Sequence, residues 1–246
     1  MKRFILALLL TAATAAHATS WFVYDIDNLE TVTGNKTETT RSIASITKLM
    51  TAIVTLDYDR NLDRQIYVKN THIGTGWRTR RSLLHAMLIK SDNVAAYYLA
   101  DDYPGGVPAF VRAMNTKARE LYMDHAEFAD SSGLLADNRA TATDVAILAA
   151  AAYSYPEISE ISTKPSAEIP VTKTSTRLLQ NTNYRLLNTF DDIVVSKTGF
   201  TRRAGYCVTM IVEHLGRRFI VVVLGAPSKD QRYKLATRLI NTHIKQ

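Results

Sequence analysis

One segment of the sequence places a hydroxyl and an amine where they can react together. Ser45 and Lys48 stand three positions apart within residues 41–57, RSIASITKLMTAIVTLD, whose apolar residues recur at helical spacing. If a helix begins near Ser45, the two side chains share one face and touch, which makes a nucleophile with its own base. Backbone N–H groups in the first helical turn could also stabilise an oxyanion. Taken alone, the segment favours a simpler interpretation, an N-cap serine and a solvated lysine.

Two later tripeptides, Ser91-Asp92-Asn93 and Lys197-Thr198-Gly199, follow this segment in order. Together with Ser45 and Lys48 they resemble the three motifs of the penicillin-binding protein and serine β-lactamase superfamily. The segments IASITKLMTA and SKTGFTRRAGYC are similar to the corresponding segments of the low-molecular-mass D-alanyl-D-alanine peptidases. The segment DDYPGGVPAFVRAMNTKARELYM resembles their small DD-endopeptidase branch.

This resemblance implies a catalytic role for several residues. Lys48 would deprotonate Ser45, which attacks a carbonyl to form an acyl-enzyme, while backbone N–H groups of Ser45 and Phe200 hold the oxyanion. Ser91 would relay a proton to the leaving amine. Because an amine is a base only when neutral, the pKa of Lys48 must fall well below its ordinary value near 10.4. We expect burial, the helix N-terminus and the charge of Lys197 across the cleft to lower it.

The resemblance also implies how substrate is bound. Asn93 would orient the substrate amide, and Lys197 and Thr198 would bind a substrate carboxylate. Gly199 fits an edge strand along which a substrate strand lies close, since a Cβ would obstruct it. The expected partners are peptidoglycan stem peptides, with β-lactam antibiotics as covalent inhibitors.

Other kinds of site find less support. The histidines show no i, i+4 pair and the single cysteine, Cys207, has no partner, so we predict no metal and no cofactor. No Gly-x-Ser-x-Gly elbow of an α/β-hydrolase is present. A β-lactamase of class A type would need a glutamate followed by asparagine, which residues 129–143 lack. A non-catalytic alternative is a penicillin-sensing or wall-binding module that forms the acyl adduct and does not hydrolyse it.

The N-terminus predicts export. Lys2 and Arg3 precede an apolar run that ends in Ala16-His17-Ala18, so residues 1–18 read as a signal peptide and 19–246 as a DD-peptidase catalytic domain in the periplasm. No later apolar run is long enough for a transmembrane anchor. Without the leader the chain has 28 Lys and Arg against 23 Asp and Glu, a net charge of +5. This mild basicity suits an anionic cell wall, and we expect no nucleic acid partner.

The hydrophobic pattern predicts an α+β fold. Strands are expected at 21–26 and 29–33, and again at 193–197, 205–213 and 217–224, before a closing helix at 229–245. Between them we expect one short strand at 66–68 and helices that begin at Ser82, Val94, Pro108 and Thr143 or Asp144. Strands at both ends imply one antiparallel sheet with an inserted helical lobe, the fold that the resemblance also implies. Cys207 falls in a strand and is expected to pack in the core.

The sequence leaves two alternatives for the bond that is cut. An endopeptidase would cut D-alanyl-diaminopimelyl cross-links, and a carboxypeptidase would remove terminal D-alanine. The endopeptidase is favoured by the branch resemblance and by the lack of room after the last helix for a membrane-holding domain. Arg202 and Arg203 could contact the extra carboxylates of a cross-linked dimer, or could be a solvated pair.

Overall fold

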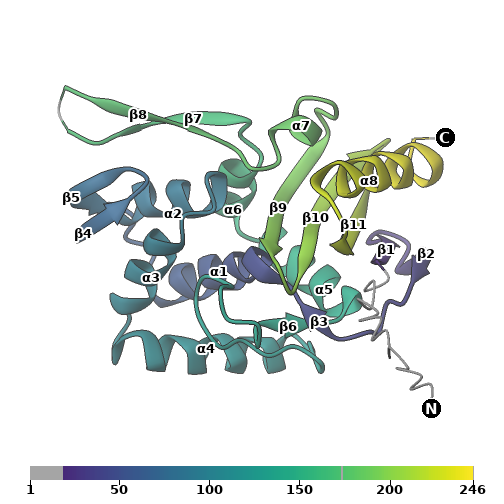
Figure 1. Ribbon diagram of the computed structural model, residues 1–246, viewed down its shortest axis with the longest axis horizontal. Coiled ribbons are helices and arrows are strands. Elements are labelled where there is room, and N and C mark those ends of the chain that lie inside the picture. Colours follow the sequence, from purple (N-terminus) through teal and green to yellow (C-terminus); the bar gives the residue numbers. More distant parts are fainter. Residues whose placement is uncertain (1–18, 173, 246) are drawn as a thin grey trace, which may run out of the picture.

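A five-stranded antiparallel sheet brings the two ends of the chain together (Figure 1). The computed structural model describes residues 19–172 and 174–245, so the predicted signal peptide, residues 1–18, lies outside them. The strands lie in the order β2, β1, β11, β10, β9. Their bounds are Glu30–Asn35, Ser20–Asp25, Arg217–Ala226, Gly205–His214 and Ile193–Thr201. The predicted α+β architecture is confirmed, and β9 is left as an edge strand.

Helices cover both faces of the sheet and form the lobe inserted between β2 and β9 (Figure 1). The closing helix α8 (Lys229–His243) lies on one face and α5 (Ala142–Tyr153) on the other. The lobe contains a 3-10 turn η1 (Ala44–Thr47), α1 (Lys48–Tyr58), α2 (Arg80–Ile89), α3 (Asn93–Asp101), α4 (Gly106–Glu120) and α6 (Pro156–Ser162). A short helix α7 (Tyr184–Leu187) precedes β9.

The alternation of side chains along β11 shows why the sheet needs both layers. Val221 and Val223 pack into a core beneath α8, whereas Ile220 and Val222 belong to the larger core shared with α1 and α5. Cys207 lies in the larger core, as predicted, and burial raises the pKa of its thiol to about 11. It is therefore a protonated packing residue at neutral pH.

The structure contains two hairpins where the sequence predicts only one short strand, at 66–68. β4 (Gln65–Thr71) pairs with β5 (Gly74–Thr79), and β7 (Ser166–Pro170) pairs with β8 (Thr176–Gln180). A further short pair joins β3 (Arg41–Ser42) to β6 (Arg139–Ala140).

Two predicted helix starts, at Ser82 and at Thr143 or Asp144, are wrong by one or two residues. Helix α2 is capped by Thr79, whose hydroxyl accepts from the N–H of Ser82, so Ser82 is inside the first turn. Helix α5 is capped by Thr141, which forms a capping box with Asp144. Among the described residues, no helix has both the length and the apolar character needed to cross a bilayer.

Candidate active site

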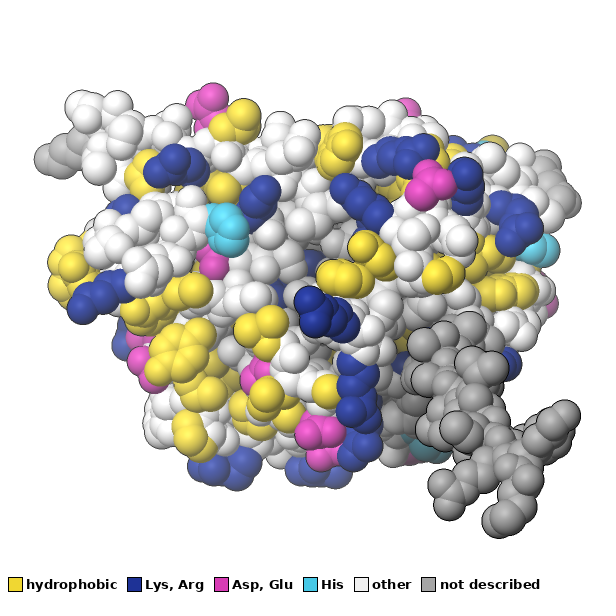
Figure 2. Space-filling view, viewed as in Figure 1, with side chains coloured by type: hydrophobic (Ala, Val, Ile, Leu, Met, Phe, Trp, Pro, Cys, Tyr) yellow, Lys and Arg dark blue, Asp and Glu magenta, His cyan; other side chains and the backbone are white. Residues whose placement is uncertain are grey.

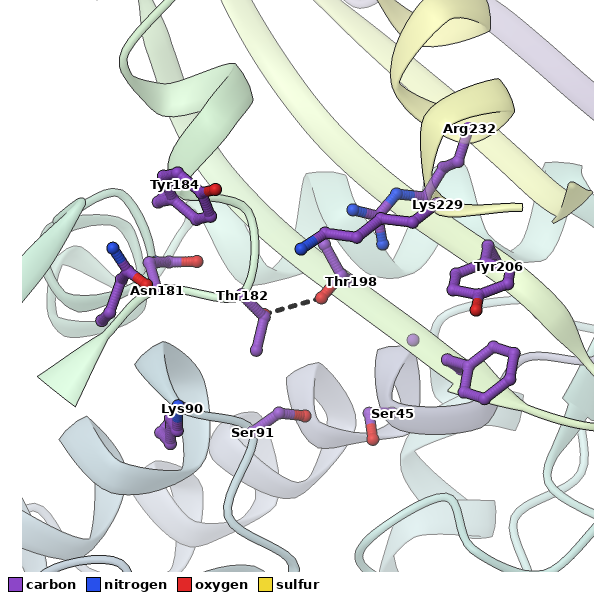
Figure 3. A pocket seen from close by; sticks show the side chains of 13 residues that line it. Ser45, Lys90, Ser91, Asn181, Thr182, Tyr184, Thr198, Tyr206, Lys229 and Arg232 are labelled. Carbon is purple, nitrogen blue, oxygen red and sulfur yellow. Dashed lines mark hydrogen bonds between the residues drawn. The ribbon is translucent and has the colours of Figure 1, made fainter.

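Ser45 lies in the η1 turn immediately before α1, at the edge of a cleft (Figure 3). The turn is strained, because Ala44 has a φ of 48°, and it is tied by a 2.7 Å bond from the Thr47 hydroxyl to the Ala44 carbonyl. Ser45 is thus one turn earlier than the α-helix proper, which begins at Lys48. The predicted contact still forms, with 2.9 Å between Lys48 Nζ and Ser45 Oγ.

Lys48 is fully buried, and its amine has three neighbours within hydrogen-bond distance. Besides Ser45 Oγ, these are Asn93 Oδ1 at 2.7 Å and the carbonyl of Ser132. Burial lowers the pKa of Lys48 to about 7, against the opposing effect of Asp130 and Asp92. The charge of Lys197 was expected to contribute to the low pKa of Lys48. The pKa is lowered by burial, and Lys197 is not among the groups that shift it.

The three neighbours suit a neutral amine. The Ser132 carbonyl and Asn93 Oδ1 can only accept, so they take the two hydrogens of a neutral amine and leave its lone pair for the Ser45 hydroxyl. In the ammonium form the third hydrogen would point at Ser45 Oγ and no base would remain. When Lys48 is neutral, this geometry therefore directs its lone pair toward the proton of the Ser45 hydroxyl.

Ser91 stands at the corner between α2 and α3, beside Ser45 on the floor of the cleft (Figure 3). Its backbone is left-handed, with φ of 62°, and its hydroxyl is 3.0 Å from Lys197 Nζ. Lys197 is buried and also donates to the Thr198 carbonyl. Burial, together with the charges of Lys48 and Arg232, lowers the pKa of Lys197.

Asp92 holds this corner in place. Its buried carboxylate accepts from the backbone N–H groups of Val94 and Ala95, which caps α3, and from that of His72 in the β4–β5 hairpin. The middle residue of the second motif therefore has a structural role, while its neighbours Ser91 and Asn93 face the two lysines.

The opposite wall of the cleft is the edge strand β9. Thr198, Gly199 and Phe200 line it, and the Thr198 hydroxyl donates to that of Thr182 at 2.7 Å (Figure 3). A Cβ at Gly199 would lie 2.8 Å from the Ile43 carbonyl and 3.0 Å from the Ser45 nitrogen. The structure thus gives a different reason for this glycine, since the close approach is to the turn that carries Ser45.

The loop behind Ser45 supplies the carbonyl that binds Lys48. Asp130 accepts from the backbone N–H groups of Ser132, Gly133 and Leu135, which fixes the loop. Burial opposes ionisation of Asp130, but these backbone bonds outweigh it and lower the pKa of its carboxyl. This carboxylate is therefore ionised and fully engaged.

Several residues that line the cleft belong to no sequence motif and were not predicted as site residues. Lys229 and Arg232 come from α8, and in Figure 3 the Lys229 side chain reaches across the cleft toward Thr198. Arg232 is only 6% exposed, and its Nε has no partner among the described residues. Lys90, Gln180, Asn181, Thr182 and Tyr184 complete this side of the cleft. A buried guanidinium without a full set of acceptors is suited to bind an anion.

All eight predicted site residues thus gather around one cleft of about 380 Å³. Ser45, Ser91, Thr198, Gly199 and Phe200 line it directly. Lys48 and Lys197 lie behind these residues and are hydrogen-bonded to Ser45 and Ser91, and Asn93 accepts a hydrogen bond from Lys48. Among the described residues, no group of His, Cys, Asp and Glu side chains could hold a metal ion.

Comparison with known proteins places this arrangement in a family. Residues 9–228 match the family described as D-alanyl-D-alanine carboxypeptidase. The chain is 34% identical over 232 residues to the D-alanyl-D-alanine endopeptidase of Escherichia coli, covering 89% of the chain and 75% of that relative. It is 37% identical over 210 residues to the D-alanyl-D-alanine endopeptidase of Pseudomonas aeruginosa, covering 80% and 67%.

Solved structures are similar over nearly the whole chain. Penicillin-binding protein D2 from Listeria monocytogenes, solved with cefotaxime bound, has a TM-score of 0.82 at 30% identity and covers 91% of this chain and 96% of its own. A variant of a Streptomyces DD-transpeptidase has a TM-score of 0.85 at 27% identity, covering 92% and 97%. The chain therefore belongs to the D-alanyl-D-alanine carboxypeptidase family and is a serine-type D-Ala-D-Ala peptidase of the penicillin-binding protein group.

Proposed function

We propose that this peptidase is a periplasmic DD-endopeptidase that hydrolyses D-alanyl-diaminopimelyl cross-links of peptidoglycan through an acyl-enzyme on Ser45. The observation that carries the proposal is the 2.9 Å contact between Ser45 Oγ and the buried amine of Lys48, whose other two neighbours are oxygen acceptors. Three similar proteins, from E. coli, P. aeruginosa and Haemophilus influenzae, are described as D-alanyl-D-alanine endopeptidases.

The acylation step follows from the two serines and two lysines. Lys48 takes the proton of Ser45, and Ser45 Oγ bonds to the D-alanyl carbonyl carbon, whose oxygen gains the negative charge. Backbone N–H groups of Ser45 and Phe200 hold this oxyanion, since β9 runs directly beside the Ser45 backbone. When the C–N bond breaks, Ser91 passes its proton to the leaving amine and takes up the proton that Lys48 removed from Ser45, so Lys48 is again a neutral base for deacylation.

Deacylation reverses the direction of proton transfer. Water attacks the acyl carbon, its proton goes to Lys48, and Ser45 recovers a proton as the C–O bond breaks. Asn93 orients the substrate amide and also accepts from Lys48, so it links substrate position to the base. Lys197, Thr198 and Arg232 bind the carboxylate next to the cut bond.

The side of the cleft beyond Ser91 favours a large leaving group. Besides Arg232 it presents the amines of Lys90 and Lys229, together with amide and phenol groups of Gln180 and Tyr184. A free D-alanine has one carboxylate and would contact few of them. A cross-linked leaving strand carries further carboxylates and peptide groups that such a wall can bind.

Arg202 and Arg203, the pair that follows the third motif, were expected either to contact the extra carboxylates of a cross-linked dimer or to be a solvated pair, and we propose the first. Arg203 does not line the cleft but borders a second cavity of about 530 Å³ together with Lys36, Arg41 and Arg139. Figure 2 shows Lys and Arg side chains gathered over the region of β3 and β6. Carboxylates of the stem that becomes the acyl group would meet this positive potential.

The proposed function is tested by comparing a cross-linked peptide dimer with a monomeric pentapeptide at equal concentration. We expect the higher kcat/KM for the dimer. A higher value for the pentapeptide would make the protein a carboxypeptidase, the activity named for similar proteins at 29–30% identity. Acylation by penicillin without hydrolysis of either peptide would point to a sensing module.

A lysine variant sharpens this comparison. Lys229→Gln removes an amine from the leaving-group side and is expected to lower kcat/KM for the dimer by about tenfold, with a smaller effect on the pentapeptide. Lys234→Gln on the same helix is the matched control, because Lys234 is 72% exposed and pairs with Asp230. It should leave both values unchanged.

A further inference from the structure

The β4–β5 hairpin presents two aromatic side chains to solvent. Tyr67 and Trp77 stand directly opposite each other in the antiparallel register, with their ring centroids 5.6 Å apart in an edge-on arrangement. They are 46% and 63% exposed. Figure 2 shows hydrophobic side chains at the surface over this end of the molecule. Exposed aromatic pairs of this kind mark interaction surfaces.

The polar side chains around the pair indicate what it binds. Gln65, Lys69 and Thr75 alternate with the aromatic residues and are exposed on the same strands. Residues 65–79 contain no Asp or Glu. The apolar face of a sugar ring can stack on Tyr and Trp rings while amide, amine and hydroxyl groups bond its substituents. An amino-sugar polymer fits this surface better than a cationic or purely apolar ligand.

The hairpin is held as a rigid platform. The buried Arg78 donates to the carbonyls of Ile73 and Thr75 in its own hairpin and to that of Val171 beside the β7–β8 hairpin. At the turn, the N–H of His72 donates to Asp92 at 2.6 Å, and its ring Nδ1 is 3.1 Å from the same oxygen. A platform that is fixed before binding loses little entropy when it binds a ligand.

The attachment at His72 also sets the distance from the platform to the reaction. Tyr67 precedes His72 by five residues, a separation of at most about 16 Å along an extended chain. An extended stem peptide of about four residues spans roughly 14 Å. A leaving strand whose amine lies at Ser91 would therefore have its sugar chain near Tyr67 and Trp77.

We propose that Tyr67 and Trp77 form a binding surface for the amino-sugar glycan that carries the leaving stem peptide. The proposal rests on the proposed function, because only a cross-linked substrate has a glycan on the leaving side. The surface would hold the enzyme on intact wall polymer and would add nothing to the cleavage of small soluble peptides.

Binding is measured by tryptophan fluorescence with peptide-free glycan strands as the probe. The chain has two tryptophans, Trp21 and Trp77, which makes the signal assignable. We expect the strands to change the fluorescence of the wild type and of Trp21→Phe but not of Trp77→Phe. Tyr67→Gln should weaken binding about tenfold. The absence of a saturable change in the wild type would overturn the proposal.

Cleavage provides the second measurement. The double variant Tyr67→Gln/Trp77→Gln is expected to digest intact sacculi about tenfold more slowly and to cleave a soluble cross-linked dimer at the wild-type rate. Tyr122→Asn is the control, because Tyr122 is 79% exposed beyond the end of α4 and Asn tolerates its φ of 59°. Unchanged penicillin labelling of Ser45 shows that each variant is folded.

The outcomes separate this surface from the proposed function. If the wild type fails to cleave the soluble dimer, the endopeptidase assignment is wrong even where glycan strands bind. If the double variant digests sacculi at the wild-type rate, the glycan surface is wrong. Two other results would assign the aromatic pair to another partner and overturn the glycan proposal. One is binding to anionic lipid vesicles in place of glycan, and the other is a homodimer of the wild-type protein that Trp77→Gln dissociates.

Discussion

At the scale of single residues, the chemistry depends on the protonation of two buried lysines. Lys48 has two acceptor-only neighbours and a hydroxyl, an arrangement that suits a neutral amine, and burial brings its pKa to about 7. Lys197 is buried beside Ser91 and its pKa is also lowered. A substrate carboxylate next to Lys197 would favour its ammonium form and so restore the charge that binding requires.

The first prediction concerns the pH dependence of acylation. Because Lys48 acts as a base only when unprotonated, the rate of penicillin acylation at Ser45 should rise with pH and level off above about 7. Lys48→Ala should abolish acylation, whereas Lys197→Ala should chiefly raise the penicillin concentration needed for half-maximal rate. The adduct is located by peptide mapping and its formation is followed by intact mass.

Lys164→Ala is the control for this prediction, since Lys164 forms an ion pair with Glu160 on the surface. A Lys48→Ala variant that kept the limiting acylation rate would refute the role of Lys48, and an adduct on a serine other than Ser45 would refute the nucleophile.

At the scale of elements, the reactive turn is supported by a loop far from it in the sequence. Gly133 lies beside η1 with φ of 82°, and a Cβ there would be 2.0 Å from the Ala44 carbonyl. The same loop supplies the Ser132 carbonyl to Lys48. The position of Ser45 and the orientation of its base therefore depend on one close contact between backbones.

The second prediction follows from this contact. Gly133→Ala should destabilise the protein by more than about 2 kcal/mol and should slow acylation strongly, because both the left-handed backbone and the collision must be relieved. Gly216→Ala is the matched control, since Gly216 has φ of 75° but nothing within 4 Å of an added Cβ. It should cost about 1 kcal/mol and leave acylation unchanged. Urea unfolding and intact mass measure the two effects.

If Gly133→Ala were no less stable than Gly216→Ala and were acylated at the wild-type rate, the turn would not depend on this close contact.

At the scale of the whole molecule, the fold engages its nearby carboxylates in structure. Asp130 and Asp92, the carboxylates that act on the charge of Lys48, each accept several backbone N–H groups. Neither is available to activate water against an ester on Ser45. In this respect the site differs from that of a β-lactamase that uses a dedicated carboxylate to activate water.

The third prediction is that the penicilloyl adduct on Ser45 is long-lived. Because backbone N–H groups engage the nearby carboxylates of Asp130 and Asp92, hydrolysis relies on Lys48, and the bulky adduct hinders the approach of water. Intact mass after removal of free penicillin gives the lifetime, and turnover of a cross-linked peptide by the same preparation shows that the enzyme is active. Turnover of many penicillin molecules per second would instead identify a β-lactamase.

Much of this architecture could be predicted because its signals are local. The alternation of β1 and β2, the long β10 and β11 and the spacing of Ser45 and Lys48 are encoded within single segments. Strand β5 was not predicted, because Gly74 and Gly76 lower its strand propensity. It exists because it pairs with β4 and because Arg78 binds the carbonyls of its turn.

The sequence alone determined the strands of the main sheet, most of the longer helices, the family motifs and the residues that could carry the reaction, because these depend on neighbours along the chain. Only the tertiary structure decided how they act. Lys48 becomes a base because the Ser132 loop and the core bury it, and Arg232 enters the cleft because α8 packs on the sheet. Burial and orientation arise from contacts between distant segments, which no local pattern of residues encodes.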